Sequence, residues 1–278
     1  MSKVWFITGA GSGIGAGVAK AALRAGDRVV ATGRNLDKVR NALRDVASEN
    51  IAFVQLDVAD EAQAEAAVEQ AVKRFGRIDV AVNNAGYSLL GHFEEMTIDE
   101  LESQLATNFY GVVYVMRAVL PVMRKQRSGR IINISSLAGE VGFKHCAAYA
   151  ASKFAVEGLS LSVAAEVEQF GITITLVEPG FFRTALLDDR NVRWPGNAIE
   201  DYAAEGKPQD VWSAYNGTQQ GDPAKLGDVL VTIAGMTNPP KQFQAGSDAV
   251  AVIRPALEGR LQEIKDHEAL SQSTDGTF

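Results

Sequence analysis

The chain of 278 residues contains a single cysteine, Cys146. One cysteine cannot form an internal disulfide, and so low a content is typical of proteins that fold in a reducing compartment. The first residues go straight into a strand-like segment, Val4 to Ile7, and not into the basic stretch that opens a secretory signal. We therefore expect a cytoplasmic protein.

Several other features are scarce. The three histidines, His92, His145 and His267, stand in no metal-ligand spacing, so the sequence predicts no metal site. No apolar run approaches the ~18 residues of a membrane span. The net charge of -7 argues against nucleic acid or an anionic membrane surface as a partner. Hydrophobic and charged contents of 46% and 22% are ordinary for a soluble globular protein.

What is present is an alternation of short apolar strands with amphipathic helices. The strands are expected at Lys3–Thr8, Arg28–Thr32, Ile51–Leu56, Ile78–Asn83, Arg130–Ser135, Ile172–Val177 and Gln242–Ala245, and the helices at Ile14–Ala25, Leu36–Ser48, Glu61–Phe75, Leu101–Lys125, Ala147–Phe170, Pro223–Met236 and Asp248–Leu270. Strands that are apolar on both faces indicate a parallel sheet covered by helices on both sides. The sequence thus predicts a single α/β domain with a doubly wound, Rossmann-like parallel sheet.

A glycine-rich turn joins the first strand to the first helix. It reads Thr8-Gly9-Ala10-Gly11-Ser12-Gly13-Ile14-Gly15. Glycines let the backbone turn tightly and approach a pyrophosphate held at the helix N-terminus, where free amides favour negative charge. We interpret the turn as a dinucleotide site, the alternative being a tight turn with no ligand.

The end of the second strand indicates which dinucleotide is bound. An acidic residue here would bind the ribose hydroxyls of NAD, but the sequence has Gly33 followed by Arg34. A guanidinium pairs well with a phosphate, which favours NADP(H) over NAD(H). The alternative is a solvated arginine at the start of a helix. Asp57, after the third strand, could bond the adenine or cap the next helix.

Two amides stand out further along the chain. Asn83 begins an Asn-Asn-Ala-Gly turn at the carboxyl edge of the sheet, where ligands of doubly wound folds bind. Asn108 lies in an apolar and aromatic helical stretch, where a buried amide is costly unless it has partners. Asn108 either bonds a neighbouring backbone or serves a site.

Tyr149 and Lys153 are four residues apart in a predicted helix and so share one face. An adjacent ammonium stabilises the phenolate and lowers the pKa of a tyrosine, which makes the phenol a better acid-base group. Lowering that pKa by ~3 units takes ~4 kcal/mol, more than one exposed lysine supplies, so a second positive charge or a dry pocket is also required. The alternative is that Tyr149 packs in the core and Lys153 reaches solvent.

Residues 181–222 form a long segment rich in Gly, Pro, Asp and Asn. A stretch of this length without regular structure is usually a lid or a binding loop. We therefore divide the single domain 1–278 into a cofactor-binding core at 1–180, a substrate loop at 181–222 and a C-terminal cap at 223–278.

Taken together, these motifs resemble the short-chain dehydrogenase/reductase family. The resemblance covers about residues 3 to 190 and rests on TGAGSGIG, NNAG, Asn108, Ser136 thirteen positions before Tyr149, YAASK and PGFFRT. Beyond Phe182 it is looser and is greatest to bacterial members similar to hydroxysteroid dehydrogenases. It departs from NADP-preferring members in one place, because Ser12 stands where these often carry a basic residue.

The resemblance implies a role for each matching residue. Tyr149 would exchange a proton with the substrate oxygen, Lys153 would lower the pKa of Tyr149 and bond the nicotinamide ribose, Ser136 would bond the substrate oxygen, and Asn108 would hold a water that links Lys153 to solvent. The cofactor contacts are expected from Gly9, Gly11, Ser12, Gly13, Ile14, Gly15, Arg34, Asp57, Val58, Asn83, Ala85, Tyr149, Lys153, Pro179, Phe182 and Thr184.

The expected activity is hydride transfer between NADP(H) and a small hydrophobic ketone or secondary alcohol. Expected substrate contacts are Ser136, Val141, Phe143, Tyr149, Phe181, Leu186 and Leu187. Members of the family usually form homodimers or homotetramers. The alternatives are a catalytically idle NADP-binding sensor or scaffold, and an epimerase or dehydratase of the extended relatives, for which too little chain follows Gly180.

Overall fold

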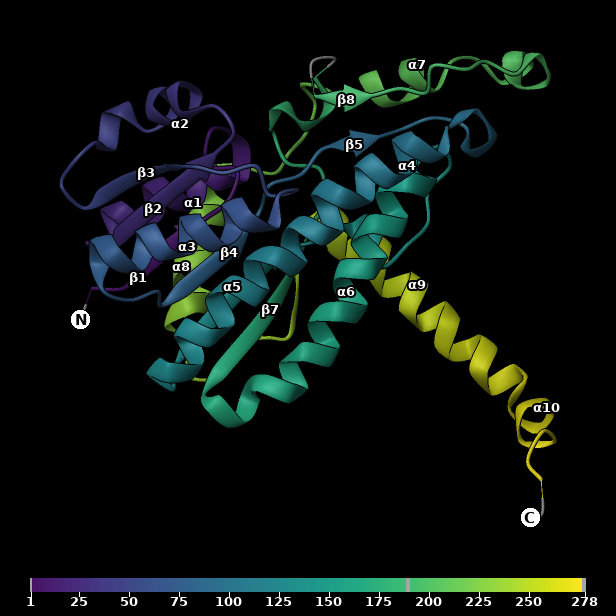
Figure 1. The fold of residues 1–278 in the computed structure, drawn as a ribbon. Helices are drawn as coiled ribbons and strands as arrows, with labels where there is room; N and C mark the ends of the chain where they lie inside the picture. Colours follow the sequence, from purple (N-terminus) through teal and green to yellow (C-terminus); the bar gives the residue numbers. More distant parts are fainter. Residues whose placement is uncertain (1, 189–190, 277–278) are drawn as a thin grey trace.

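In the computed structural model, which describes residues 2–188 and 191–276, the chain folds around one seven-stranded sheet (Figure 1). Its strands are β1 (Val4–Ile7), β2 (Arg28–Gly33), β3 (Ile51–Gln55), β4 (Val80–Asn83), β6 (Gly129–Ile134), β7 (Ile172–Pro179) and β9 (Gln242–Ala245). They run in the order β3-β2-β1-β4-β6-β7-β9, and every pair is parallel. The predicted α/β doubly wound fold and single domain are confirmed.

Helices cover both faces of this sheet. The helices of the described residues are α1 (Gly13–Arg24), α2 (Leu36–Ala42), α3 (Glu61–Phe75), α4 (Ile98–Leu105), α5 (Gly111–Gln126), α6 (Ala147–Val167), α7 (Pro208–Ser213), α8 (Pro223–Gly235), α9 (Ser247–Asp266) and α10 (Glu268–Gln272). Helices α1 and α8 pack on one face, and α3, α5 and α6 pack on the other. In Figure 1, α9 and α10 project from the body toward the C-terminus.

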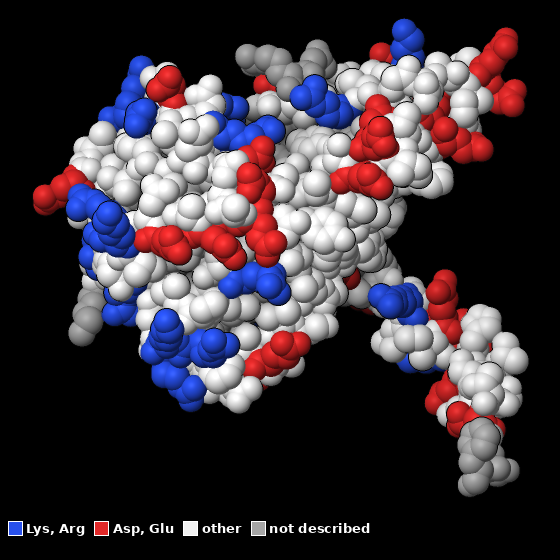
Figure 2. All heavy atoms as spheres, viewed as in Figure 1, with Lys and Arg blue, Asp and Glu red and all other residues white. Residues whose placement is uncertain are grey.

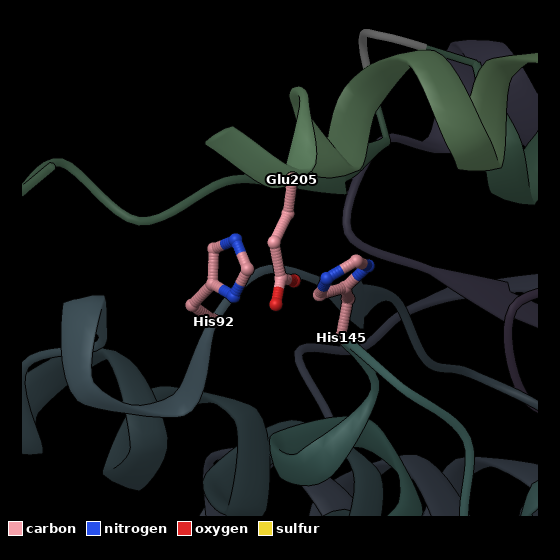
Figure 3. Close-up of side chains that lie close together, drawn as sticks. All are labelled: His92, His145 and Glu205. Atoms are coloured by element: carbon pink, nitrogen blue, oxygen red, sulfur yellow. The ribbon is translucent and has the colours of Figure 1, made fainter. Parts of the chain in front are cut away.

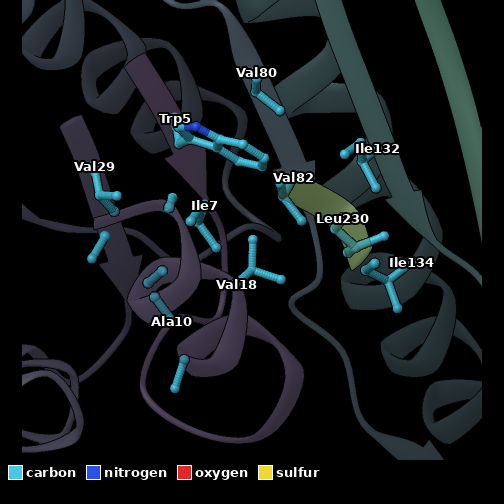
Figure 4. Close-up of a cluster of buried hydrophobic side chains, with 14 of the residues drawn as sticks. Trp5, Ile7, Ala10, Val18, Val29, Val80, Val82, Ile132, Ile134 and Leu230 are labelled. Carbon is cyan, nitrogen blue, oxygen red and sulfur yellow. The ribbon is translucent and has the colours of Figure 1, made fainter. Parts of the chain in front are cut away.

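Alternate residues of each strand build the two cores, because successive side chains of a strand point to opposite faces. In β1, Trp5 and Ile7 join the core under α1 and α8, whereas Phe6 joins the core under α3, α5 and α6. Figure 4 shows the first of these cores, with Leu230 of α8 beside the β6 residue Ile134. Both strand faces are therefore apolar, as the sequence indicated.

Helices α1 and α8 approach each other closely through glycine. A Cβ built on Gly17 would lie 2.3 Å from the Pro223 carbonyl oxygen, and one built on Gly227 would lie 2.5 Å from the Gly17 carbonyl oxygen. Any side chain at either position would overlap backbone atoms. The contact fixes the C-terminal cap against the helix that follows the glycine-rich turn.

The long helix between β4 and β6 is interrupted by a π-helical turn. The helix runs as α4, the π turn η3 (Ala106–Tyr110) and α5, instead of the single expected helix Leu101–Lys125. Ile98–Gln126 is also long and apolar enough to span a membrane by length and composition, contrary to the expectation that no such segment exists. Val115, Val119 and Met123 of this helix are nevertheless buried against α3 and the sheet.

Three other expectations were wrong in their boundaries. The helix expected at Leu36–Ser48 ends at Ala42, and the short 3-10 turn η1 (Arg44–Val46) follows. The helix expected at Asp248–Leu270 breaks at His267 between α9 and α10. The segment expected to lack regular structure contains the 3-10 turns η6 (Ala185–Leu187) and η7 (Glu200–Glu205), helix α7, and strand β8 (Val192–Arg193), which pairs with β5 (Ser88–Leu89).

Candidate active site

A cavity of about 380 Å³ lies at the carboxyl ends of the parallel strands. This edge is where doubly wound folds bind their ligands. Its walls come from the glycine-rich turn, the ends of β2, β4, β6 and β7, the first turns of α6 and the 181–222 segment. Of the predicted site residues, Gly9, Gly11, Ser12, Gly13, Ile14, Arg34, Asp57, Val58, Ala85, Ser136, Phe143, Tyr149, Lys153, Pro179, Phe181, Phe182, Thr184, Leu186 and Leu187 line it.

The glycine-rich turn forms one end of the cavity because its backbone is held tightly from behind. Gly9 has a φ of 66°, and a Cβ there would lie 2.9 Å from the Asn84 side-chain nitrogen. Asn84 Nδ2 donates to the Thr8 and Gly9 carbonyls at 2.9 and 3.2 Å. Gly15 lies behind the turn instead of in the cavity wall, and its Cβ would lie 2.5 Å from the Gly9 carbonyl oxygen.

Helix α1 begins at Gly13, directly behind this turn. Its N-cap Ser12 makes no side-chain capping bond, so the first helical amides are not capped by that hydroxyl. Free amides at a helix N-terminus, approached through glycine, suit the pyrophosphate of a dinucleotide. The residues present at this end of the cavity therefore fit a nicotinamide dinucleotide.

Two basic side chains, Arg34 and Lys38, stand at the β2 end of the cavity. Arg34 is exposed, and neither side chain takes part in an ion pair among the described residues. Lys38 lies in the first turn of α2, whose N-cap Asn35 accepts the Lys38 amide at 3.0 Å, and Arg34 comes just before this cap. Sequence reasoning missed Lys38, because Arg34 lies outside the helix that carries Lys38 and helical spacing does not relate the two.

Asp57, which also lines this end of the cavity, does not cap the following helix, α3. Asp60 is the N-cap of α3 and accepts the Gln63 amide at 3.1 Å. Asp57 accepts the Ala59 amide at 3.1 Å and lines the cavity. Of the two alternatives left open for Asp57, the structure thus removes the capping one.

The structure contradicts the predicted cofactor contact of the Asn83 side chain. Its side chain is buried within the sheet layer, where Nδ2 donates to Asn133 Oδ1 at 2.8 Å. The next residue, Asn84, lines the cavity in its place. The reason is strand parity, since adjacent residues point to opposite sides and β4 ends at Asn83.

Asn108 lies in the π turn and is only 1% exposed. Its Oδ1 accepts the Tyr87 amide at 3.1 Å, and its Nδ2 donates to the Tyr87 carbonyl at 3.0 Å and to Ser152 Oγ at 3.2 Å. The buried amide is therefore satisfied by a neighbouring backbone, which was one of the two alternatives. Asn108 does not line the cavity but ties the chain after β4 to the residue before Lys153.

The predicted catalytic pair lies at the middle of the cavity. Tyr149 and Lys153 both line it from α6, and Lys153 Nζ lies 5.5 Å from the centre of the Tyr149 ring. Lys153 is 6% exposed and donates to the Ile134 carbonyl at 2.8 Å. The side chains therefore face one cavity, and the alternative of a lysine that reaches solvent is wrong.

The ionisation of this pair differs from the simple expectation. Burial raises the pKa of Tyr149 above its ordinary value of 10.0, and a hydrogen bond with Ser136 lowers it by less. Burial lowers the pKa of Lys153 to about 8, while the Glu157 carboxylate raises it. Desolvation thus outweighs the hydrogen bond with Ser136, and Tyr149 is a neutral phenol at neutral pH.

The remaining wall of the cavity is apolar. It includes four residues that sequence reasoning did not single out, Leu90, Leu137, Cys146 and Trp212. The predicted Val141 does not line the cavity. Burial raises the pKa of the Cys146 thiol to about 12, so this residue acts as a small apolar group. Trp212 Nε1 is buried without a hydrogen-bond partner in residues 2–188 and 191–276. No sequence signal pointed to Trp212, because the 181–222 segment lacks periodicity.

Comparison with known proteins identifies the family of the chain. Residues 3–193 match the family of short chain dehydrogenases, and the chain belongs to that family. A 3-ketodihydrosphingosine reductase of Bacteroides thetaiotaomicron is 39% identical over 248 residues, which cover 88% of each chain. A short-chain dehydrogenase structure from Streptomyces avermitilis superposes with a TM-score of 0.90 at 35% identity, covering 99% of this chain and 100% of that one. A structure of ElxO with NADP bound has a TM-score of 0.75 at 30% identity, covering 90% of this chain and 100% of that one. The chain is therefore an oxidoreductase of the short-chain dehydrogenase type.

Proposed function

We propose that the protein is an NADP(H)-preferring carbonyl reductase or alcohol dehydrogenase that acts on a hydrophobic ketone or secondary alcohol, with Tyr149 as general acid and base. The observation that carries the proposal is that Tyr149, Lys153 and Ser136 meet in one cavity with the glycine-rich turn. The end of the cavity that suits the cofactor and the part that holds the proton-transfer residues thus belong to one continuous cavity. When bound, the nicotinamide coenzyme supplies or accepts the hydride.

The proton step follows from the neutral state of Tyr149. A buried phenol beside an ammonium can give its proton to the substrate oxygen as negative charge develops there. Ser136, at the end of β6, is the N-cap of the 3-10 turn η4 (Leu137–Gly139), and its Oγ accepts the Ala138 amide at 3.1 Å. That bond fixes the Ser136 side chain, and its hydroxyl, which bonds Tyr149 in the structure, can turn to donate to the substrate oxygen.

The preference for NADP(H) rests on Arg34 and Lys38. Two basic side chains at the β2 end of the cavity match a 2′-phosphate, and Lys38 supplies the second positive charge that Ser12 does not. The NADP-bound ElxO, at 30% identity, supports the assignment.

The apolar wall supports a hydrophobic substrate. Phe143, Leu186 and Leu187 face the cavity with Trp212, and Phe181 stacks on Tyr215 with ring centres 4.7 Å apart. The Trp212 Nε1 donor has no partner in the described part of the chain, so it is suited to a polar atom on an otherwise apolar substrate. The similarity to a 3-ketodihydrosphingosine reductase supports a ketone as the oxidised substrate.

The proposal also includes self-association. The apolar side chains of Phe154 and Leu161 on α6 are 44% and 41% exposed, and Figure 2 shows few charged atoms over this part of the molecule. Along the projecting α9, Leu257, Leu261 and Ile264 are 47%, 52% and 61% exposed. Such unpartnered apolar surfaces favour a homodimer or homotetramer, which the molar mass from light scattering tests.

The direct test of the activity is turnover. Purified protein is mixed with NADPH or NADH and a panel of hydrophobic ketones, and the loss of nicotinamide absorbance is followed. Reduction of at least one ketone, faster with NADPH, is expected. Tight NADPH binding with no turnover on any ketone or alcohol would instead support a sensor or scaffold.

A further inference from the structure

His92, His145 and Glu205 come from three separate segments and meet outside the cavity described above. His92 precedes the 3-10 turn η2 (Phe93–Glu95), His145 lies just before α6, and Glu205 ends η7. One ligand atom from each, two ring nitrogens and a carboxylate oxygen, lie within 4.8 Å of one another. Figure 3 shows the carboxylate of Glu205 reaching between the two imidazole rings.

The framework that holds the two histidines is fixed by the fold itself. The Gly91 amide donates to the His145 carbonyl at 2.9 Å, which joins the two segments through their backbones. The rings of His92 and His145 meet edge to face with centres 4.5 Å apart. On its other side, His92 stacks on Tyr202 of η7 at 4.2 Å. The ligands are thus brought together without any need for an ion.

One nitrogen of this cluster has no partner. His145 Nε2 is buried and makes no hydrogen bond with any of the described residues. A buried imidazole nitrogen left unpaired is costly, and such an atom beside a second imidazole and a carboxylate is suited to a metal ion.

We propose that His92, His145 and Glu205 bind a divalent transition metal of the zinc type. Two imidazoles and one carboxylate form a zinc ligand set, whereas magnesium and calcium prefer oxygen ligands throughout. Metal bonds of ~2.0–2.1 Å in a tetrahedron place ligand atoms roughly 3.4 Å apart, so the cluster closes slightly around the ion. Water takes the fourth position.

Lys144 is the group that opposes a cation here. Its Nζ lies 2.5 Å from Glu205 Oε2, and the Lys144 side chain is 67% exposed. An exposed ion pair contributes little stability, so the metal can displace this ammonium at small cost.

The metal would fix the 199–206 segment on the body of the protein. This segment already contacts it, since the Ile199 amide donates to Glu95 Oε1 at 3.0 Å. Cys146, the residue after His145, lines the main cavity, and Tyr149 follows one turn later on α6. We therefore expect metal binding to stabilise the protein and to change the KM of the carbonyl substrate, while the KM of the cofactor stays unchanged.

Titration of the chelator-treated full-length chain with zinc chloride tests the site. The expected result is one zinc per chain and a higher melting temperature, since a ligand that binds only the native state stabilises it. The variants His145→Asn and His92→Gln should each weaken zinc binding at least about tenfold. Asparagine suits position 145, where φ is 62° and a left-handed backbone must be kept. His267→Gln, which removes a histidine outside the cluster, is the matched control.

Cobalt(II) gives a second readout, because a tetrahedral site with nitrogen ligands produces strong visible bands that His145→Asn should abolish. Circular dichroism of the zinc-free variants shows whether they are folded. Three results would each overturn the proposal: no zinc bound at one equivalent, zinc binding unchanged in folded His145→Asn and His92→Gln, or calcium bound as tightly as zinc. None of them bears on the reductase activity itself, which is assayed in the chelator-treated protein; the change in KM is measured by adding zinc to that assay.

Discussion

The ammonium of Lys153 lies 5.5 Å from the centre of the Tyr149 ring, and both side chains face the same cavity. Tyr149→Phe keeps the ring and removes only the oxygen that carries the proton. The kcat of this variant should fall by about 10²- to 10⁴-fold, the usual contribution of a general acid. Steady-state kinetics gives kcat, and a fluorescence titration with NADPH should give a Kd within about threefold of the wild type. Full turnover by Tyr149→Phe would contradict the mechanism.

The second prediction concerns Arg34 and the preference for NADPH over NADH. Arg34→Ala should raise the KM for NADPH by roughly ten- to a hundredfold, since a charge-assisted contact contributes about 1.5–3 kcal/mol. The KM for NADH should hardly change, because NADH has no 2′-phosphate. Lys38→Ala should act in the same direction. Arg40→Ala serves as the control, since Arg40 pairs with Asp37 and does not line the cavity. Equal increases in both KM values for Arg34→Ala would refute the assignment.

Glu157 makes the stability of the protein depend on pH. Burial raises the pKa of Glu157 from 4.5 to about 7. Between these two values the folded state binds more protons than the unfolded state, so stability is full below about pH 4.5 and falls as the pH rises through 7. Glu157→Gln removes this dependence and should raise the free energy of unfolding at pH 8 by up to about 3 kcal/mol.

Urea unfolding of Glu157→Gln at pH 4.5 and pH 8 measures this effect. The free energies of unfolding of the wild type and Glu157→Gln should differ less at pH 4.5 than at pH 8. Glu166→Gln, an exposed change on the same helix, should stay within about 0.5 kcal/mol of the wild type at both values. A stabilisation by Glu157→Gln that is the same at pH 4.5 and pH 8 would show that Glu157 ionises normally.

The glycine contact between α1 and α8 gives a prediction about packing. Gly227→Ala places a Cβ 2.5 Å from the Gly17 carbonyl oxygen and should destabilise the protein by about 1–3 kcal/mol. Gly235→Ala, in the same helix, meets nothing within 4 Å and should be close to neutral. Thermal melting of both variants makes the comparison. If the two changes had equal effects, the close approach of α1 and α8 would be wrong.

The sequence predicted the sheet and the order of its helices well, because both depend on apolar periodicity. The pattern also put Tyr149 and Lys153 on one helix face, and the family resemblance added Ser136, which lines the same cavity. The prediction of a cofactor contact at Asn83 was wrong by one residue, because strand parity at the end of β4 decides which amide reaches the cavity.

Other features could not be predicted because they depend on long-range packing. The pairing of β5 with β8 involves two-residue strands that leave no periodic signal. The raised pKa of Tyr149 depends on how deeply the phenol is buried, which the spacing of two residues does not determine. Spacing along the chain also gave no indication that His92 and His145 would meet, because a backbone bond between their segments brings them together.

The contact of α1 with α8 has a consequence for how the protein is made. The two glycines in contact are about 210 residues apart in the chain, so the part of this core face that α8 covers stays exposed until nearly the whole polypeptide has left the ribosome. During synthesis the N-terminal strands expose an apolar surface that chaperones recognise. We expect chains that stop before residue 223 to aggregate, even though they contain Tyr149, Lys153 and the whole glycine-rich turn.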